Sequence, residues 1–188
     1  MQSYLFWKPK IDFVVSLIAV TVLWPFLLGI LLLAAADTSS SGLFVQKRVG
    51  QHGRLFDIYK FRTIHPVSQR ISGLGRFLRR SKLDELPQLF NILRGDMSLV
   101  GPRPDLPGYY DRLEGNSRRI LQLKPGLTSD AGILYRNEEQ LLSAQEDPES
   151  FNDHVLFPDK VKRNLEYLDS ISLSNDFRII IRTLVSFF

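Results

Sequence analysis

The amino-acid sequence predicts an α+β protein that is mostly helical, with an N-terminal segment inserted into a membrane. Three observations lead to this prediction. Residues 13–36 carry no charged side chain, two strand-like runs flank a glycine-containing turn, and most other apolar residues recur at helical spacing. Of the 188 residues, 44% are hydrophobic and 23% charged, which suits a folded core and argues against disorder. We expect two parts, a membrane segment over 1–38 and a domain at the membrane surface over 39–188.

The apolar run at 13–36 is long enough to enter a bilayer. As a helix rising about 1.5 Å per residue it would extend roughly 35 Å, against a hydrocarbon core of about 30 Å. A cleaved secretory signal is the least favoured interpretation, because the apolar part of such a signal has roughly 7–15 residues. Length and composition by themselves favour a single membrane span.

A hairpin that enters the membrane and returns to the same face is the competing interpretation. Pro25, near the middle of the run, removes a helical hydrogen bond and tends to kink a helix. Basic residues flank both ends, and the positive-inside bias draws both flanks toward the cytoplasm. The flanking cations are Lys8, Lys10, Lys47, Arg48, Arg54, Lys60 and Arg62.

A short β-hairpin is expected directly after the membrane segment. The runs LFVQKRVG (43–50) and RLFDIYKF (54–61) are rich in β-branched and aromatic residues. The turn 50–53 contains a glycine at each end, which favours a tight connection between two antiparallel strands.

Amphipathic helices are expected on both sides of the central region. Between residues 72 and 81, Leu74, Phe77 and Leu78 share one helical face and arginines occupy the others. Such a helix is half-buried on the protein surface or lies on an anionic bilayer. The C-terminal helix either packs on the core or lies in the membrane interface. Its apolar side comprises Phe177, Ile180, Ile181, Leu184 and Phe188.

Pro87 is expected to open another helix, since proline suits the first helical position. The spacing of its apolar residues predicts a buried face made of Leu86, Leu89, Phe90 and Leu93. Asp84 and Glu85 precede this start, where the partial positive charge of a helix N-terminus stabilises carboxylates. On this pattern alone, an ordinary capped helix start is the favoured interpretation.

The residues around Asp84 and Glu85 favour a reactive site over an ordinary helix start. Three cations immediately precede the pair, namely Arg79, Arg80 and Lys82. A Gly-Pro-Arg-Pro turn at 101–104 restricts the backbone around Arg103 and so aims its guanidinium. A carboxylate, a metal ion and an aimed arginine are the components of a phosphoryl-transfer site. Adjacent side chains on a helix point about 100° apart, so the two acids cannot both attack one phosphorus. One acid would attack, and the other would adjust the reactivity of the first or help hold a metal.

The sequence also excludes several kinds of site. Because it has no cysteine, disulfides, thiolate zinc sites and a thiol nucleophile are ruled out. It contains no phosphate loop ending in Gly-Lys-Ser/Thr, no His-Glu-x-x-His helix and no Asp-x-Asp motif. A net charge of +4 suits any anionic partner, but the apolar segment argues against a nucleic-acid-binding protein. A membrane-anchored protein that binds anionic lipid or nucleotide without turnover is the other alternative.

These features together resemble the small monotopic polyprenol-phosphate phosphoglycosyl transferases of the bacterial sugar transferase family. The resemblance rests on the apolar N-terminus with its central proline and on four motifs that cover most of the chain in order. The motifs are QKRVGQHGRLFDIYKFRT, GRFLRRSKLDELPQLFNILRGDMSLVGPRP, LKPGLT and LEYLDSISLSNDFRIIIRTL. The second motif is long and specific.

The resemblance implies transfer of a sugar-1-phosphate from a UDP-sugar to undecaprenyl phosphate, with release of UMP and Mg²⁺ as cofactor, as the first membrane step of glycoconjugate assembly. Asp84 matches the family's nucleophile, which would attack the β-phosphorus and form an aspartyl phosphosugar that the lipid phosphate then attacks. Glu85 matches the supporting acid. Lys60, Arg79 and Arg103 match basic positions expected to contact phosphates. Mg²⁺ would bind beside Asp84 and a diphosphate oxygen.

The resemblance also implies a re-entrant hairpin kinked at Pro25 and interfacial helices around a cytoplasmic active site. The protein would then be monotopic on the cytoplasmic face of the bacterial inner membrane, in contact with its lipids, with homo-oligomerisation left open. Two departures from the family pattern stand out: Trp24 replaces the usual serine before Pro25, and the residues after LKPGLT differ, which leaves the sugar unidentified. Arg136 and Glu138 are candidates for sugar selectivity, with a plain helix start as the alternative.

Overall fold

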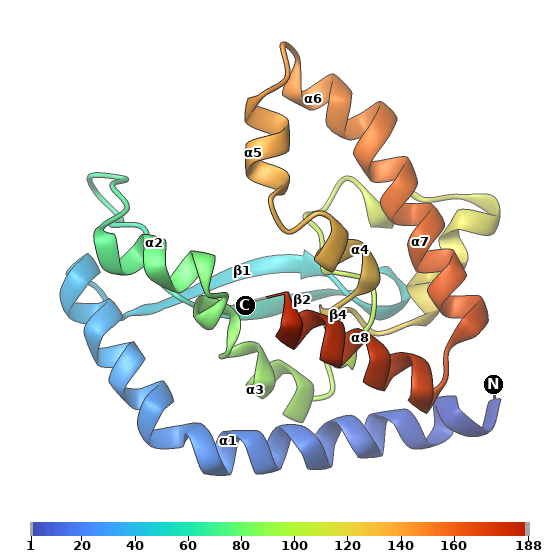
Figure 1. Ribbon diagram of the computed structural model, residues 1–188, viewed down its shortest axis with the longest axis horizontal. Coiled ribbons are helices and arrows are strands. Elements are labelled where there is room, and N and C mark those ends of the chain that lie inside the picture. The colour runs from blue at the N-terminus through green and yellow to red at the C-terminus, as the bar shows by residue number, and fades with distance from the viewer. Residues whose placement is uncertain (1, 187–188) are drawn as a thin grey trace.

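The structure, a computed structural model, describes residues 2–186. Figure 1 shows one long helix, α1, along one side of a body built from a β-hairpin and shorter helices. The helices are α1 (Gln2–Thr38), α2 (Gly73–Arg80), α3 (Gln88–Leu93), α4 (Asp130–Leu134), α5 (Glu138–Ser143), α6 (Pro148–Phe151), α7 (Phe157–Ser170) and α8 (Leu173–Val185). The strands are β1 (Leu43–Val49), β2 (Leu55–Phe61), β3 (Ser98–Val100) and β4 (Gly126–Thr128). The predicted mostly helical α+β class is confirmed.

Shorter helical turns connect these elements. They cover Gln51–Gly53, Leu83–Glu85, Tyr110–Arg112 and Gly115–Gln122 as 3₁₀ turns, and Asn152–Leu156 as a π-helical turn.

The predicted membrane segment is one continuous helix, α1, rather than two antiparallel arms. Figure 1 shows that α1 bends and that its C-terminal part turns toward α2. Pro25 lies inside the helix, where it lacks the N–H that would bond to the preceding turn. The helix is long and apolar enough to cross a membrane, and only 17% of its most apolar window is buried by the rest of the protein. Its re-entrant course and its sidedness stay predictions.

One of the cations expected to flank the apolar run, Lys8, is buried inside the protein. Lys8 is 6% exposed, and its ammonium group pairs with Asp12 and Asp176 inside the protein. Its charge is therefore compensated, and it adds little to the positive flank that the hairpin argument used. Lys10 remains exposed on that side of the apolar run.

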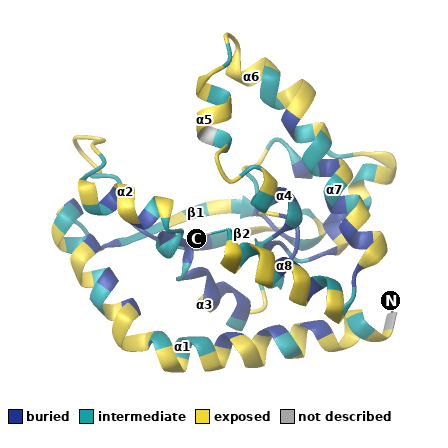
Figure 2. Ribbon diagram, viewed as in Figure 1, coloured by how far each residue is buried: buried dark blue, intermediate teal, exposed yellow. Residues whose placement is uncertain are grey.

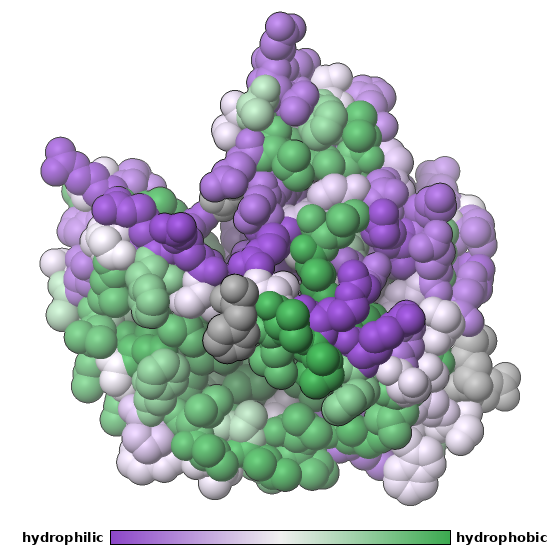
Figure 3. All heavy atoms as spheres, in the orientation of Figure 1, coloured by the Kyte–Doolittle hydropathy of each residue, from purple (hydrophilic) through white to green (hydrophobic). Residues whose placement is uncertain are grey.

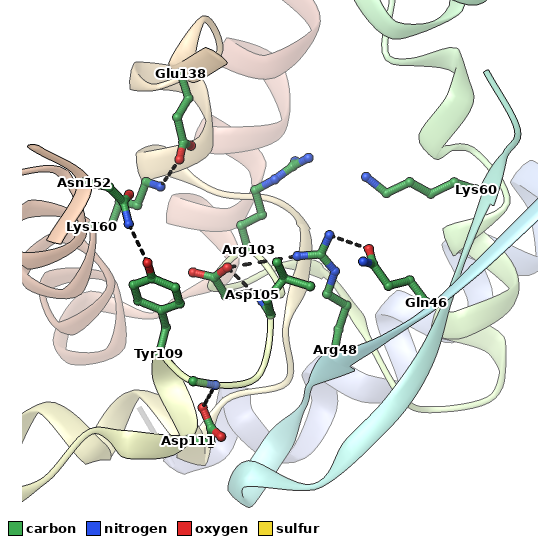
Figure 4. A network of polar contacts seen from close by, with 12 residues as sticks. Gln46, Arg48, Lys60, Arg103, Asp105, Tyr109, Asp111, Glu138, Asn152 and Lys160 are labelled. Atoms are coloured by element: carbon green, nitrogen blue, oxygen red, sulfur yellow. Dashed lines mark hydrogen bonds and ion pairs between the residues drawn. The ribbon is translucent and has the colours of Figure 1, made fainter. Parts of the chain in front are cut away.

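The predicted β-hairpin is confirmed. Strands β1 and β2 pair antiparallel, with Leu43 opposite Phe61 and Val49 opposite Leu55. At the turn, His52 and Gly53 both have positive φ, which allows the chain to reverse within four residues. The hairpin carries Arg48 and Lys60 toward the same region of the molecule (Figure 4).

The buried face predicted for the helix after Pro87 is wrong in part. Phe90 is 44% exposed, whereas Asn91 is fully buried beside β2. The Asn91 side chain accepts a hydrogen bond from the Tyr59 backbone N–H and donates one to the Asp57 carbonyl oxygen. Because the edge of β2 presents unpaired backbone groups, α3 turns a polar side chain toward it.

A second, two-stranded sheet follows α3. Strands β3 and β4 run parallel, with Ser98 opposite Gly126 and Val100 opposite Thr128. At the end of β3 a Cβ on Gly101 would come within 2.4 Å of the Lys124 carbonyl oxygen, so only glycine fits there. This close approach fixes where the turn holding Arg103 leaves the sheet.

Figure 2 shows many exposed residues along α1 and α8, and a large part of them are apolar. Along α8 the exposed residues are Phe177, Ile181, Leu184 and Val185, while Ile179 is buried in the core. On the predicted apolar side, Ile180 packs against the core, whereas Phe177, Ile181 and Leu184 are exposed, so neither interpretation holds for the whole side. The interfacial location of the exposed residues stays a prediction, and Phe188 lies outside the described residues. In α2, Leu78 is buried and Phe77 is 59% exposed, as expected for a half-buried helix.

Figure 3 shows that apolar side chains gather on the side formed by α1, and hydrophilic ones on the opposite side near α5 and α6. A surface divided in this way is typical of a protein that rests on a bilayer.

Candidate active site

Asp84 and Glu85 lie in the 3₁₀ turn that joins α2 to α3. Lys82 starts this turn with φ of 57°, and Pro87 caps α3, which itself has six residues. The acids thus precede a very short helix, and the helix-end charge expected to stabilise them is a minor effect beside burial and the neighbouring ionised groups.

Glu85 is buried and holds two cations from different parts of the chain. Its carboxylate accepts a hydrogen bond from Lys60 Nζ at 3.1 Å and is bound by both terminal nitrogens of Arg103, one of them at 3.2 Å. Burial raises the pKa of Glu85, but the charges of Arg103 and then Lys60 outweigh it and hold that pKa well below its usual range. Glu85 therefore stays ionised and positions the cations, which supports the tuning role and leaves it few free oxygen positions for a metal.

The surroundings of Asp84 differ from those of Glu85 in hydrogen bonding and in their effect on the pKa. It is 8% exposed, and its Oδ1 has no hydrogen-bond partner among the described residues. Burial, followed by the negative charge of Glu85, raises the pKa of Asp84 to about 6, against the opposing effect of Lys60 and other cations. At neutral pH the side chain is mostly an ionised carboxylate with an unbonded oxygen, which is the state that a nucleophile needs.

The residues at this site fit a magnesium ion that takes most of its ligands from elsewhere. Residues 2–186 contain no group of three or more His, Cys, Asp or Glu side chains placed to hold a metal. The unbonded Oδ1 of Asp84 offers one hard oxygen ligand. Magnesium at phosphates commonly takes one or two carboxylates plus phosphate and water oxygens, and Asp84 would supply such a carboxylate.

Arg48 belongs to the same site, although its place in the sequence marks it only as one of the cations flanking the apolar run. Figure 4 shows its side chain reaching from β1 toward the space between Lys60 and Arg103. Its Nη2 donates to Gln46 at 2.8 Å, its Nη1 lies 4.0 Å from Asp105, and its Nε has no partner among the described residues. Burial lowers the pKa of Arg48, the effect of Asp105 opposes this, and the nearby charge of Arg103 lowers it further.

The remaining predicted residues lie around this centre. Arg79 is in the last turn of α2, and its charge lowers the pKa of Asp84. Glu138 begins α5 and accepts a hydrogen bond from Lys160 at 2.6 Å, on the far side of Arg103 in Figure 4. Arg136 lies in the connection between α4 and α5. The structure therefore brings Lys60, Asp84, Glu85 and Arg103 together, a set that we call the acid–cation cluster, and places Glu138 at its border.

Comparisons with known proteins agree with this arrangement. Residues 3–188 match the family described as Bacterial sugar transferase. The chain is 34% identical over 191 residues to the UDP-glucose:undecaprenyl-phosphate glucose-1-phosphate transferase of Xanthomonas campestris pv. campestris, covering 93% of this chain and 37% of that protein. It is 34% identical over 164 residues to the undecaprenyl-phosphate galactose phosphotransferase of Salmonella typhimurium, covering 73% of this chain and 34% of that protein.

A shorter relative is matched over more of its length. This is the UDP-glucose:undecaprenyl-phosphate glucose-1-phosphate transferase of Caulobacter vibrioides, 34% identical over 195 residues, with 95% of this chain and 68% of that protein covered. By contrast, the chain spans about a third of the length of the Salmonella and Xanthomonas proteins.

Proposed function

The chain belongs to the bacterial sugar transferase family, and from this premise we propose that it transfers a sugar-1-phosphate from a UDP-sugar to undecaprenyl phosphate, with release of UMP. One observation carries the proposal. Asp84 is a buried carboxylate with an unbonded oxygen, next to a glutamate that already holds Lys60 and Arg103. The relatives' names include both glucose and galactose, so the sugar is not assigned.

The reaction would proceed in two displacements at phosphorus. An Asp84 oxygen forms a bond to the β-phosphorus of the UDP-sugar, and the bond between that phosphorus and the bridging oxygen breaks. The bridging oxygen keeps the electron pair and leaves as part of UMP. An oxygen of undecaprenyl phosphate then attacks the same phosphorus, and the Asp84 carboxylate departs. Since each step replaces one P–O bond with another, no oxidant or reductant is needed.

The other residues of the acid–cation cluster would stabilise charge and fix geometry. Lys60 and Arg103 would neutralise the diphosphate, and Glu85 keeps both cations in place before substrate binds. Side chains held in this way need little reorganisation when charge develops on the phosphoryl oxygens. Magnesium, bound by Asp84 and phosphate oxygens, would add further positive charge at the diphosphate.

The membrane would hold the acceptor phosphate at the height of the site. The apolar outer surface of α1 suits the lipid phase, while the acid–cation cluster is formed by charged residues of β2, of the turn before α3 and of the turn after β3. We place α1 as a re-entrant helix in the bacterial inner membrane, with the domain on the cytoplasmic face where nucleotide sugars are made. Cysteines introduced at Ser3 and Ser40 would then react with an impermeant reagent from the same side; opposite-side labelling would mean a true span.

The test of this function is release of UMP by the purified full-length chain. UDP-glucose, UDP-galactose and UDP-N-acetylgalactosamine would each be incubated with undecaprenyl phosphate and Mg²⁺. We expect multiple turnovers with at least one donor, and none when Asn replaces Asp84. Donor binding without any UMP would instead identify a binding protein, and full activity of the Asp84→Asn variant would remove the proposed nucleophile.

A further inference from the structure

A pocket lies away from the acid–cation cluster, between the N-terminal half of α1 and the C-terminal end of α3. It encloses about 390 Å³. Its apolar lining comes mainly from Phe13, Val14, Ile92, Leu93 and Met97. Three cations line it as well, namely Lys10, Arg94 and Lys124. An apolar pocket lined by several cations matches a ligand with an apolar body and an anionic group.

Two of the three cations, Lys10 and Lys124, have no anionic partner among residues 2–186, whereas the third, Arg94, has one. Arg94 is 3.5 Å from Asp96 and also donates to the Tyr59 hydroxyl. The Lys10 ammonium instead lies over the Phe6 and Trp7 rings, at 4.2 and 4.5 Å from their centroids.

Lys124 forms neither an ion pair nor a side-chain hydrogen bond within the described part of the chain. Its Nζ lies beside Gly95, 3.6 Å from where a Cβ would stand, so it extends to the end of α3. The C-terminal carbonyls of this six-residue helix oppose an anion only weakly beside the full charges of two ammonium groups.

The apolar lining continues onto the outside of the protein. Phe13 and Val14 are 44% and 52% exposed, and Leu17 and Ile18, one turn further along the same helix, are 46% and 59% exposed. Acyl chains entering from the pocket would therefore have an apolar track along α1. A free phosphate or a nucleotide would make no use of this track, whereas a lipid would.

We propose that this pocket binds an anionic phospholipid of the surrounding membrane, with the headgroup phosphate between Lys10 and Lys124 and the acyl chains along α1. Trp7 suits this location, because tryptophan is enriched at the level of the headgroups. Along α3 and the turn before it, Glu85 and Leu93 are separated by on the order of 12 Å at the helical rise per residue. The phosphate in the pocket thus lies too far from Asp84 to react, so the lipid is distinct from the acceptor. This site does not depend on the proposed transferase activity.

Native mass spectrometry of the full-length chain in detergent tests the proposal. The chain would be mixed with phosphatidylglycerol or phosphatidylcholine of identical acyl chains, and retained lipid counted. We expect preferential retention of phosphatidylglycerol, reduced about 10- to 30-fold in a Lys10→Gln/Lys124→Gln double variant, since each basic residue near an anionic lipid contributes about fivefold. A Lys47→Gln/Lys162→Gln double variant is the matched control and should retain lipid like the wild type.

Further measurements separate the sources of any binding. Circular dichroism should show equal helix content in all variants, and millimolar inorganic phosphate should not displace the lipid, because it lacks the acyl chains. The Arg103→Gln variant should also retain phosphatidylglycerol. Loss of retention in Arg103→Gln but not in the Lys10/Lys124 variant would place the lipid at the transferase site and overturn the proposal. Equal retention of both lipids by the wild type would overturn it as well.

Discussion

Within residues 2–186, the buried charged side chains lie in two places, which differ in how completely the charges are compensated. One is the acid–cation cluster, in which Asp84 and Glu85 are buried while the side chains of Lys60 and Arg103 are 19% and 43% exposed. The other joins α1 to the C-terminal part of the chain, and we call it the anchoring cluster. It consists of Tyr4, Lys8, Asp12, Ser98, Tyr167 and Asp176.

In the anchoring cluster, both oxygens of the central acid are bonded. Asp176 Oδ2 accepts from the Tyr4 hydroxyl at 2.6 Å and from Lys8, and its Oδ1 accepts from the Tyr167 hydroxyl at 2.6 Å. Asp12 accepts from the Ser98 hydroxyl. These bonds join α1 to residues of β3 and α8 that lie 86 or more positions away in sequence, so they fix α1 against the rest of the protein.

In the acid–cation cluster, one of the two carboxylates is not fully bonded. Glu85 is as fully bonded as Asp176, but Asp84 beside it retains an unbonded, buried oxygen. A buried charge without partners is unfavourable for folding and persists where function needs it. The difference supports the proposal that the anchoring cluster serves stability and that Asp84 serves reaction, and substitutions can separate the two roles.

The largest expected effect is on turnover in the Asp84→Asn variant. Removing a nucleophile should reduce UMP release by about 10³-fold or more, because asparagine cannot form the covalent intermediate. The measurement is steady-state UMP release with an active donor. Asp57→Asn, which removes an exposed acid paired with Lys47, is the control and should stay within about twofold.

The Asp176→Asn variant should lose stability rather than chemistry. It leaves Lys8 buried with reduced compensation, so we expect the free energy of unfolding to fall by about 3–5 kcal/mol. Thermal melting in detergent measures the loss, and activity per folded molecule should remain within about threefold. Asp169→Asn, at an exposed pair with Arg119, should change stability by less than about 1 kcal/mol. An inactive but fully stable Asp176→Asn protein would remove the distinction between the clusters.

Glu85→Gln should affect both properties, because Glu85 lies beside the reactive acid and is bonded like an anchor. Losing its charge frees Lys60 and Arg103 from their shared partner, with an expected loss of about 1.5–3 kcal/mol in stability. Turnover should fall by about 10²-fold as the cations lose their positions. Melting temperatures and UMP release, measured on one preparation, check both. A change in neither would show that Glu85 does not organise the site.

The smallest effect is the pH dependence of stability in the Asp84→Asn variant. The folded pKa of Asp84, about 6, lies above its unfolded value, so the folded state binds more protons between these values and the wild type loses stability as pH rises through this range. The variant should therefore be more stable than the wild type by about 1–3 kcal/mol at pH 8 and equal to it near pH 4. Melting curves at both pH values test this, and a variant less stable at pH 8 would contradict it.

The sequence predicts well those elements that depend on residues close together in the chain. The alternation of LFVQKRV and LFDIYKF and the glycines between them specify the β-hairpin, and the spacing of Leu74 and Leu78 specifies α2. The candidate site came from the Asp84-Glu85 pair, from the Gly-Pro-Arg-Pro turn that holds Arg103, and from the family resemblance, which added Lys60. Their ion pairs with Glu85 are a result of folding.

What the sequence does not predict depends on contacts between distant residues. Lys8 appears to be a flanking cation until Asp176, 168 residues away, is brought against it. Asn91 interrupts the apolar pattern of α3 because its partners are backbone groups of β2. Arg48 has no local feature that marks it as part of the site, since its neighbour Arg103 arrives from a separate turn. The three-residue strands β3 and β4 are likewise too short to give a pattern.

The central claim is that the Asp84 carboxylate bonds to phosphorus, and trapping the adduct tests it most directly. The full-length chain would be incubated with an active UDP-sugar and Mg²⁺ but without lipid acceptor, then analysed by intact mass and peptide mapping. We expect a mass increase of one sugar phosphate on the peptide containing Asp84, release of one UMP per enzyme, and no increase in Asp84→Asn. An adduct on another residue, or turnover with no adduct and no UMP until both substrates are present, would contradict the account.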